Sequence, residues 1–155
     1  MTTHQIVNAN SNYLSFLNNN SINLIVTSPP YPMIEMWDKL FIEQDISIQE
    51  DLNNGDGNAS FIKMHNLLNK TWKECDRVLA DHGFICINIG DATRTINGNF
   101  QLYSNHSKII DFFHPWGIVY CLISCGENPQ IHLINSWGQE YTRQGLMLHI
   151  NMNTY

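Results

Sequence analysis

The sequence lacks several features that would each indicate a particular class of protein. None of its four cysteines forms a Cys-x-x-Cys pair, so a zinc site is not expected. The cysteines are instead expected to be reduced thiols. No apolar run approaches the length that crosses a bilayer, and the first residues show no basic-then-apolar signal pattern. We therefore expect a cytoplasmic protein with no membrane partner. Positive charge is scarce as well, and the net charge of −6 argues weakly against a nucleic-acid partner.

What is present fits one folded domain, because 155 residues with 43% hydrophobic content can bury a core. Apolar runs bounded by breakers predict short buried strands, and apolar residues three or four apart predict helices. Gly83 is expected to close the turn after the long helix. The predicted elements are a strand at Ile22–Thr27, a loop with a short helix at Met33–Asp56, a helix at Ser60–Leu79, a strand at Phe84–Ile89 and a helix at Asn105–Phe113.

This alternation of strands and helices predicts an α/β fold with a parallel sheet. In such sheets, ligands bind beyond the carboxyl ends of the strands. Ser28–Tyr31 follows the first strand and Gly90–Thr95 follows the second, so both segments are expected at one edge, facing one pocket.

The stretch Ser28-Pro29-Pro30-Tyr31 has the composition of a site for an exocyclic amine on an aromatic base. Two prolines fix two φ angles and remove two backbone donors, which leaves the carbonyls of Ser28 and Pro29 as rigid acceptors. The Ser28 hydroxyl adds an acceptor and the Tyr31 ring offers a stacking face. A base inside a duplex has to be flipped out to reach such a site. The alternative is a plain turn that ends the strand.

Three stretches carry a resemblance to a known family: TSPPYPMIEMWD, LLNKTWKECDRVLADHGFICINIGDATRT and NFQLYSNHSKIIDFF. Over about residues 4–113 the chain resembles the amino-methylating DNA methyltransferases of bacterial and archaeal restriction–modification systems, in the group whose SPPY motif comes first. The resemblance implies that Ser28, Pro29, Pro30 and Tyr31 form the catalytic loop that binds the amine. It also implies S-adenosylmethionine as methyl donor, double-stranded DNA as substrate and a cognate restriction endonuclease as possible partner.

The base that the resemblance implies is cytosine, methylated at N4, because SPPY is typical of those enzymes; N6 of adenine is the alternative. Asp91 and Arg94 occupy positions where the family lines the target-base pocket. For these two residues the alternative is a solvated loop whose aspartate caps a helix. His65, His82 and His106 lack the spacing of metal ligands and are expected at the surface.

The chain departs from the family pattern where a cofactor loop is expected. No Gly-x-Gly loop follows a predicted strand, and the one match, Gly55 to Gly57, lies in a polar run. We therefore expect a partial Rossmann-like methyltransferase sheet: the catalytic half, with the cofactor half missing and the residues that bind S-adenosylmethionine unknown. Two further alternatives are a catalytically inert fragment and an enzyme completed by a second chain.

The composition changes at about residue 113. Residues 114–155 contain only three charged residues, Glu127, Glu140 and Arg143, and show no clean periodicity. Read one base out of register, their codons permit a segment resembling the family's PDILWRKPTNSPNKFMGSG. Trp and Met each have one codon, so Trp116–Gly117 and Trp137–Gly138 must encode Gly, and Met152–Asn153 must encode Glu, as the family pattern requires. The interpretation is a catalytic part at 1–113 and an out-of-frame tail at 114–155 without a native fold.

Overall fold

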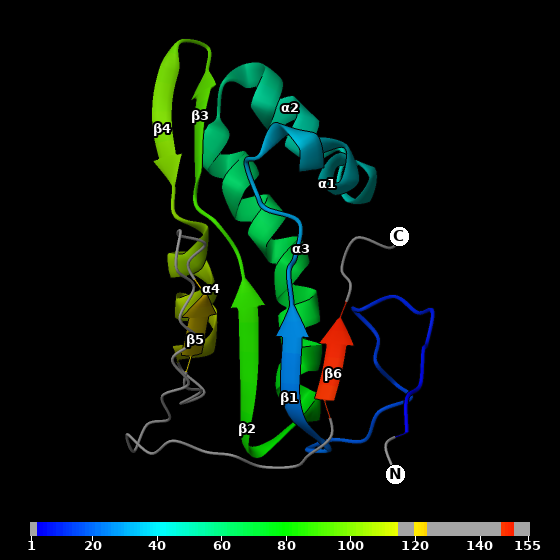
Figure 1. Cartoon of the computed structure of the whole chain (residues 1–155). Coiled ribbons are helices and arrows are strands. Elements are labelled where there is room, and N and C mark those ends of the chain that lie inside the picture. Colours follow the sequence, from blue (N-terminus) through cyan, green and yellow to red (C-terminus); the bar gives the residue numbers. More distant parts are fainter. Residues whose placement is uncertain (1–2, 115–119, 124–146, 151–155) are drawn as a thin grey trace.

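The computed structural model describes residues 3–114, 120–123 and 147–150, and these form an α/β structure built on a parallel sheet (Figure 1). The sheet has the order β5-β2-β1-β6, and every neighbouring pair in it is parallel. The bounds of its strands are β1 Ile22–Thr27, β2 Leu79–Asn88, β5 Tyr120–Ile123 and β6 Met147–Ile150. The predicted α/β class with a parallel sheet is thus confirmed, while its interpretation as half of a Rossmann-like methyltransferase sheet stays a prediction.

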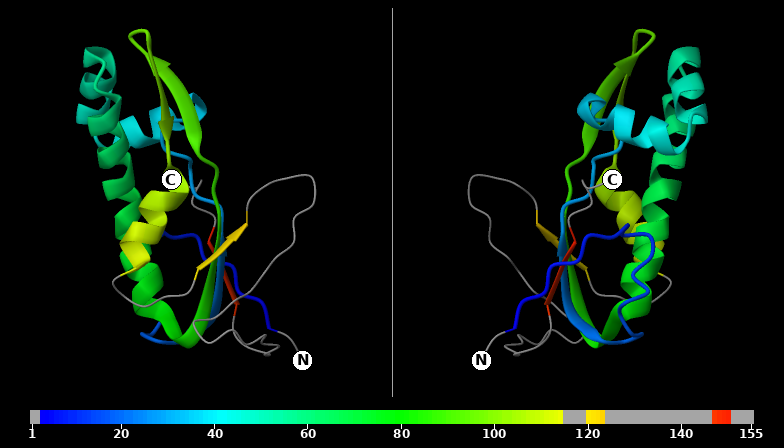
Figure 2. Two further views of the ribbon diagram at one scale, coloured as in Figure 1. Left: turned by 90° about the vertical axis from the view of Figure 1, so that its left-hand side faces the viewer. Right: turned by 90° about the vertical axis from the view of Figure 1, so that its right-hand side faces the viewer.

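Helices connect the strands and cover one face of the sheet. Figure 2 shows the long helix α3 and the shorter α4 on the same side of β1 and β2. The helical elements are η1 Glu35–Trp37, α1 Asp38–Gln44, α2 Ser47–Asn54, α3 Gly57–Val78 and α4 Asn105–Phe113. Within the described residues, no helix has the length and apolar character needed to cross a membrane.

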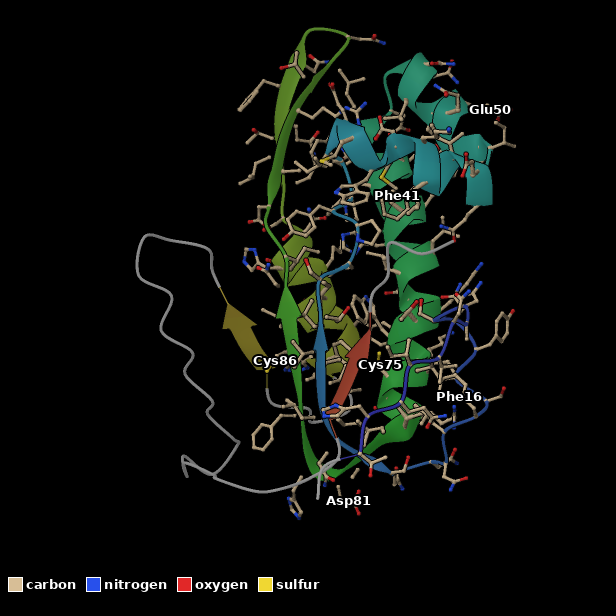
Figure 3. All side chains as sticks on the ribbon, turned by 45° about the vertical axis from the view of Figure 1, so that its right-hand side comes forward. Phe16, Phe41, Glu50, Cys75, Asp81 and Cys86 are labelled. Carbon is tan, nitrogen blue, oxygen red and sulfur yellow. The ribbon has the colours of Figure 1, made fainter. Side chains whose placement is uncertain are left out.

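The core forms where the apolar stripe of α3 meets the sheet and α4. Met64, Leu68, Trp72 and Cys75, spaced three or four residues apart along α3, are all buried. The ring of Trp72 lies 5.9 Å from that of Phe113 on α4. Figure 3 shows Cys75 on the part of α3 that lies along the sheet, and Phe41 between α1 and the opposite end of α3. These contacts fix the helices relative to the strand ends.

The predicted bounds of β1 and α4 are confirmed, and those of α3 are close. Helix α3 begins three residues earlier than predicted, at Gly57, because the Asp56 side chain accepts a hydrogen bond from the Ala59 N–H and caps it. Gly83 was expected to close the turn after this helix, and that prediction is wrong. Strand β2 begins directly at Leu79, and the left-handed residue is His82, with φ of 62°.

A β-hairpin was missed between β2 and α4. Strands β3 Ala92–Ile96 and β4 Asn99–Tyr103 pair in antiparallel fashion and extend beyond the carboxyl edge of the sheet, beside α2 (Figure 1). The signal was available, since Asn97 and Gly98 have φ of 49° and 81°, the left-handed pair of a two-residue hairpin turn. Of the segment Gly90–Thr95, which was expected to face a pocket at the sheet edge, only Gly90 and Asp91 form a loop. The rest belongs to β3.

Two described strands, β5 and β6, fall in the segment 114–155 and pair with β2 and β1. Residues 115–119, 124–146 and 151–155 of that segment lie outside the described residues. The interpretation of the segment as an out-of-frame tail stays a prediction.

Candidate functional site

The carboxyl ends of β1 and β2 lie side by side. Thr27, the last residue of β1, pairs with Ile87 of β2, so the chain leaves both strands at the same edge. The loop that contains Ser28 and Tyr31 and the loop that contains Gly90 and Asp91 therefore begin at the same edge of the sheet. The sequence predicts this for two neighbouring parallel strands.

Tyr31 lies against Gly90. A Cβ atom placed on Gly90 would be 3.4 Å from Cε2 and 3.8 Å from Cδ2 of the tyrosine ring. The ring thus borders the glycine backbone along one side while remaining half-buried, which leaves part of it accessible. The arrangement holds a partly exposed aromatic ring at the carboxyl edge of the strands.

The remainder of the loop combines buried prolines with free acceptors. Pro29 and Pro30 are buried, whereas Ser28 is exposed. Among the described residues, no hydrogen bond is made to the Ser28 hydroxyl or to the Pro29 carbonyl. These two oxygens can accept hydrogen bonds from a ligand.

A tight turn follows Tyr31. The Ile34 N–H donates to the Tyr31 carbonyl at 3.2 Å, and Pro32 and Met33 occupy the two central positions. Met33 has φ of 69°, which an L-residue other than glycine rarely adopts. Its side chain is buried and its N–H points at Sδ of Met64, 3.4 Å away, so packing on α3 stabilises the strained turn.

Asn105, the first residue of α4, connects this turn with the loop after β2. Its Nδ2 donates to the Pro32 carbonyl at 3.1 Å and to the Gly90 carbonyl at 2.9 Å. Its Oδ1 lies 3.0 Å from Nε2 of His65 on α3. The sequence placed Asn105 at the start of a predicted helix but gave no sign of its contacts with these loops.

His65 was expected at the surface, and this prediction is wrong. It lies on the inner face of α3 with 4% of its surface exposed, and its ring meets Phe61 edge-on at 4.6 Å. Burial lowers the pKa of His65 to about 4, which the hydrogen bond with Asn105 only partly offsets. A lone histidine on a helix gives no sign of such a distant partner. By contrast, His82 is exposed and His106 is half-exposed.

Asp91 contacts the start of α4. Its carboxylate lies 2.7 Å from Nδ1 of His106, accepts the His106 backbone N–H at 3.2 Å and accepts from the Ser104 hydroxyl at 3.1 Å. Burial raises the pKa of Asp91, but these hydrogen bonds outweigh it, and the net shift is downward. The contacts fit the helix-capping alternative, and a role of Asp91 in a base pocket stays a prediction.

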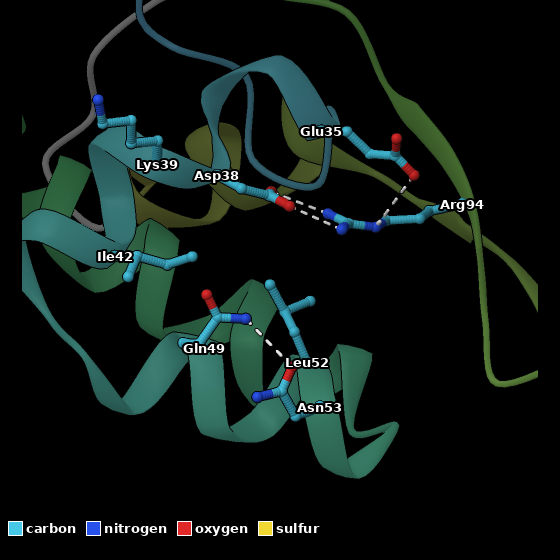
Figure 4. A pocket seen from close by; sticks show the side chains of 8 residues that line it. All are labelled: Glu35, Asp38, Lys39, Ile42, Gln49, Leu52, Asn53 and Arg94. Atoms are coloured by element: carbon cyan, nitrogen blue, oxygen red, sulfur yellow. Dashed lines mark hydrogen bonds and ion pairs between the residues drawn. The ribbon is translucent and has the colours of Figure 1, made fainter.

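Arg94 lies on the hairpin and contacts a different set of residues. Its guanidinium makes two hydrogen bonds with the carboxylate of Asp38, at 2.8 and 2.7 Å, and lies 4.0 Å from Glu35 (Figure 4). The hydrogen bonds to Asp38 raise the pKa of Arg94. The structure therefore does not bring Arg94 and Asp91 together, and a role of Arg94 in binding a base stays a prediction.

The residues around Arg94 line an open pocket of about 510 Å³ between α1, α2 and the hairpin (Figure 4). No residue of the Ser28–Tyr31 loop lines it. In the described part of the chain, no group of three or more His, Cys, Asp or Glu side chains is placed to hold a metal ion.

Comparison with known proteins gives the family. The model of the N6/N4 DNA methylase family matches residues 22–139, which is most of the chain and includes the whole site. This chain belongs to that DNA methylase family. The resemblance to amino-methylating DNA methyltransferases deduced from the three sequence stretches is thereby confirmed, while the motif order with SPPY first and the truncation stay predictions. The match begins at Ile22, the first residue of β1, and continues past residue 113, the expected end of the resemblance.

Two curated relatives are archaeal type II methyltransferases. The chain is 53% identical over 117 residues to M.MthZI of Methanothermobacter thermautotrophicus, an alignment that covers 75% of this chain and 33% of the relative. It is 42% identical over 129 residues to M.MjaI of Methanocaldococcus jannaschii, covering 76% and 43% respectively. The chain thus spans less than half the length of either relative. No solved structure matches it significantly.

Proposed function

We propose that this chain carries the target-base site of an S-adenosylmethionine-dependent DNA methyltransferase of a restriction–modification system, acting on the N4 amine of a flipped-out cytosine. The observation that supports this most directly is the Ser28–Tyr31 loop itself. Its ring lies against Gly90 at the carboxyl edge of a parallel sheet, and its acceptor oxygens make no hydrogen bonds to described residues.

The acceptors suit an exocyclic amine. The two N–H groups of the amine would donate to the Ser28 hydroxyl and the Pro29 carbonyl while the base stacks on Tyr31. The lone pair of such an amine is delocalised into the ring and is a poor nucleophile. Two fixed acceptors favour a pyramidal nitrogen and stabilise the positive charge that develops on it.

The burial of both prolines supports this role. Pro29 and Pro30 are packed into the protein and their φ angles are fixed, so the acceptors need no reorganisation when a base arrives. Fixed dipoles aimed at a developing charge stabilise it more than mobile groups do. A buried Pro-Pro pair followed by a half-exposed ring is thus suited to binding a flat, amine-bearing ligand.

The one Gly-x-Gly stretch of the chain, Gly55 to Gly57, is not arranged as a cofactor loop. Gly55 is the left-handed cap of α2, with φ of 82°, and Gly57 lies so close to the Tyr103 hydroxyl that a Cβ there would clash. These glycines serve helix capping and packing, and the element directly before them is helix α2, not a strand. We propose that the glycine loop for S-adenosylmethionine lies outside the described residues. We also propose that positively charged residues outside them contact the DNA, since the 155-residue chain has a net charge of −6.

Analysis of the modified nucleoside tests the proposal. Two proteins are incubated with duplex DNA and S-adenosylmethionine: the 155-residue chain, and a frame-restored version in which the sequence from residue 114 is read in the restored frame and on through the downstream DNA. The DNA is then hydrolysed and its nucleosides are identified by mass spectrometry. We expect N4-methylcytosine from the restored version only. N6-methyladenine would establish the adenine alternative, and no methylated nucleoside from either version would establish the inert fragment.

A further inference from the structure

The candidate site is formed by two loops that are far apart in the sequence and follow different strands. Pro32 belongs to the loop after β1, and Gly90 belongs to the loop after β2. Their carbonyl oxygens both accept hydrogen bonds from one group, the side-chain amide of Asn105. These two hydrogen bonds connect the loop after β1 and the loop after β2 through the side chain of Asn105.

The chemistry of this contact fixes the orientation of every group in it. Carbonyl oxygens only accept, so both must face the NH₂ of Asn105, and Oδ1 must face His65. Oδ1 also only accepts, so Nε2 of His65 carries the hydrogen. The other ring nitrogen, Nδ1, is buried and has no hydrogen-bond partner among the described residues. The neutral imidazole is therefore required here.

The two residues are held rigidly by different helices. Asn105 is fully buried at the first position of α4, and His65 is buried on α3 between Phe61 and Asn105. An amide held in this way sets the separation of the two carbonyls, one directly after Tyr31 and the other on the glycine that the Tyr31 ring borders. A change at either residue would alter the position of the ring.

We propose that Asn105, oriented by His65, is a positioning residue that holds the Tyr31 ring against Gly90 and so presets the stacking face for the target base. This inference rests on the proposed function for its meaning in catalysis. The geometric part concerns the position of Tyr31 and can be measured on the chain itself.

Nuclear magnetic resonance of the 155-residue chain labelled at its nine glycines measures that position. The Gly90 signal is assigned by its disappearance in Gly90→Ala, and the contribution of the ring current is defined by its shift in Tyr31→Leu. We expect the Gly90 signal of Asn105→Ala to move to the value seen in Tyr31→Leu, while a cooperative thermal transition shows that the variant is folded. A Gly90 signal unchanged in folded Asn105→Ala would overturn the proposal.

Two substitutions of His65 keep the test decisive even where Asn105→Ala fails to fold. His65→Gln retains a donor where Nε2 stood and is expected to preserve the Gly90 signal, whereas His65→Leu removes the donor and is expected to shift it. Equal signals in these two variants would remove His65 from the role. Asn66→Ala, at the exposed neighbouring position of α3, is the matched control and should leave the signal unchanged.

These outcomes are separate from those of the proposed function. If the frame-restored protein yields no methylated nucleoside, the proposed function fails while the glycine signals still report on the position of Tyr31. If it is active, Asn105→Ala is expected to lower its turnover by up to about 100-fold, the scale associated with misplacing a reacting group by 1 Å. Its affinity for S-adenosylmethionine should not change.

Discussion

The imidazole of His65 and the amide of Asn105 lie 40 positions apart in the sequence and meet at 3.0 Å inside the protein. The contact joins α3 to the first residue of α4 and needs a neutral histidine, because Nδ1 is buried without a partner among the described residues. Lys108 on α4 is close enough to disfavour a positive charge on the ring. The protonation state of the buried His65 ring thus affects both the stability of the fold and the geometry of the candidate site.

Acid should destabilise the fold through His65. Its pKa falls from 6.5 when unfolded to about 4 when folded, so the unfolded chain binds the proton more tightly. Stability is then fully present above pH 6.5 and is lost as the pH falls toward 4, by about 3 kcal/mol in total. Denaturant titrations at several pH values measure this. His65→Gln should flatten the dependence in that window, and an unchanged slope would contradict the assignment.

Other titrating groups can be separated from this effect. The pKa values of Glu74 and Asp91 are lowered, Glu74 mainly by its hydrogen bond with Arg77. Lowered carboxyl pKa values remove stability as the pH falls through the ordinary values of these groups, 4.5 for Glu74 and 3.8 for Asp91, starting at about pH 5. The loss between pH 6.5 and about 5 is therefore the part that reports on His65.

Removing the tyrosine ring or the serine hydroxyl of the candidate site should impair methyl transfer. In the frame-restored protein we expect Tyr31→Ala to weaken transition-state binding by roughly 1–3 kcal/mol, the contribution of one stacked base, with cofactor affinity near normal. Ser28→Ala should act in the same direction because it removes an acceptor. Single-turnover methylation assays measure both, and unchanged turnover in Tyr31→Ala would remove the stacking role.

The controls for these variants come from the N-terminal segment. Tyr13 has 72% of its surface exposed, and Ser15 is exposed as well. Tyr13→Ala and Ser15→Ala remove the same chemical groups away from the site. Both should methylate DNA at the rate of the unaltered protein.

The chain alone is expected not to bind S-adenosylmethionine measurably. Gly55 and Gly57, its one Gly-x-Gly stretch, are engaged in helix capping and packing. Isothermal titration calorimetry on a sample with a cooperative thermal transition measures this directly. Micromolar binding by the 155-residue chain would show that another cradle for the cofactor exists.

The ion pair between Arg94 and Asp38 should stabilise the hairpin against α1. Both side chains are largely buried, at 13% and 18% exposed, and they make two charge-assisted hydrogen bonds. Arg94→Ala should therefore lower the free energy of unfolding by about 1.5–3 kcal/mol. A double-mutant cycle with Asp38→Ala isolates the pair, and Lys39→Ala, whose pair with Glu43 is exposed, is the control. Strict additivity would argue against a stabilising pair.

The reading-frame hypothesis can be tested on the gene. If residues from 114 onward are out of frame, the third bases of their codons should spell a segment like WRKPTNSPNKF when read one base out of register. Downstream DNA should then encode a Gly-x-Gly loop preceded by a strand. Third bases that encode an unrelated segment would refute the hypothesis.

Features set by local patterns were predictable from the sequence. The apolar run before Pro29 defined β1 to the residue, and the motif at its end indicated the family. The hairpin was also predictable, since Asn97-Gly98 is a strong signal for a two-residue turn. In both cases the information lies within about ten consecutive residues.

Features set by distant contacts were not predictable. Nothing in the local sequence of His65 distinguishes a surface histidine from one paired with Asn105. Met33 adopts a left-handed conformation that its residue type disfavours, because Met64 and the core stabilise it. Nor does the local sequence of Arg94 indicate its partner Asp38, which lies 56 residues earlier.

The contact between Pro32 and Asn105 spans 73 residues, and this separation sets an order of events during synthesis. The ribosome completes the Ser28–Tyr31 loop first and adds Asn105 roughly 4–15 s later, at typical rates of about 5–20 residues per second. Parallel pairing of β1 with β2 also has to wait for α3 between them. Until β2 has been synthesised the apolar residues of β1 lack this partner, so a nascent chain arrested before Leu79 should engage chaperones more than one arrested after α4.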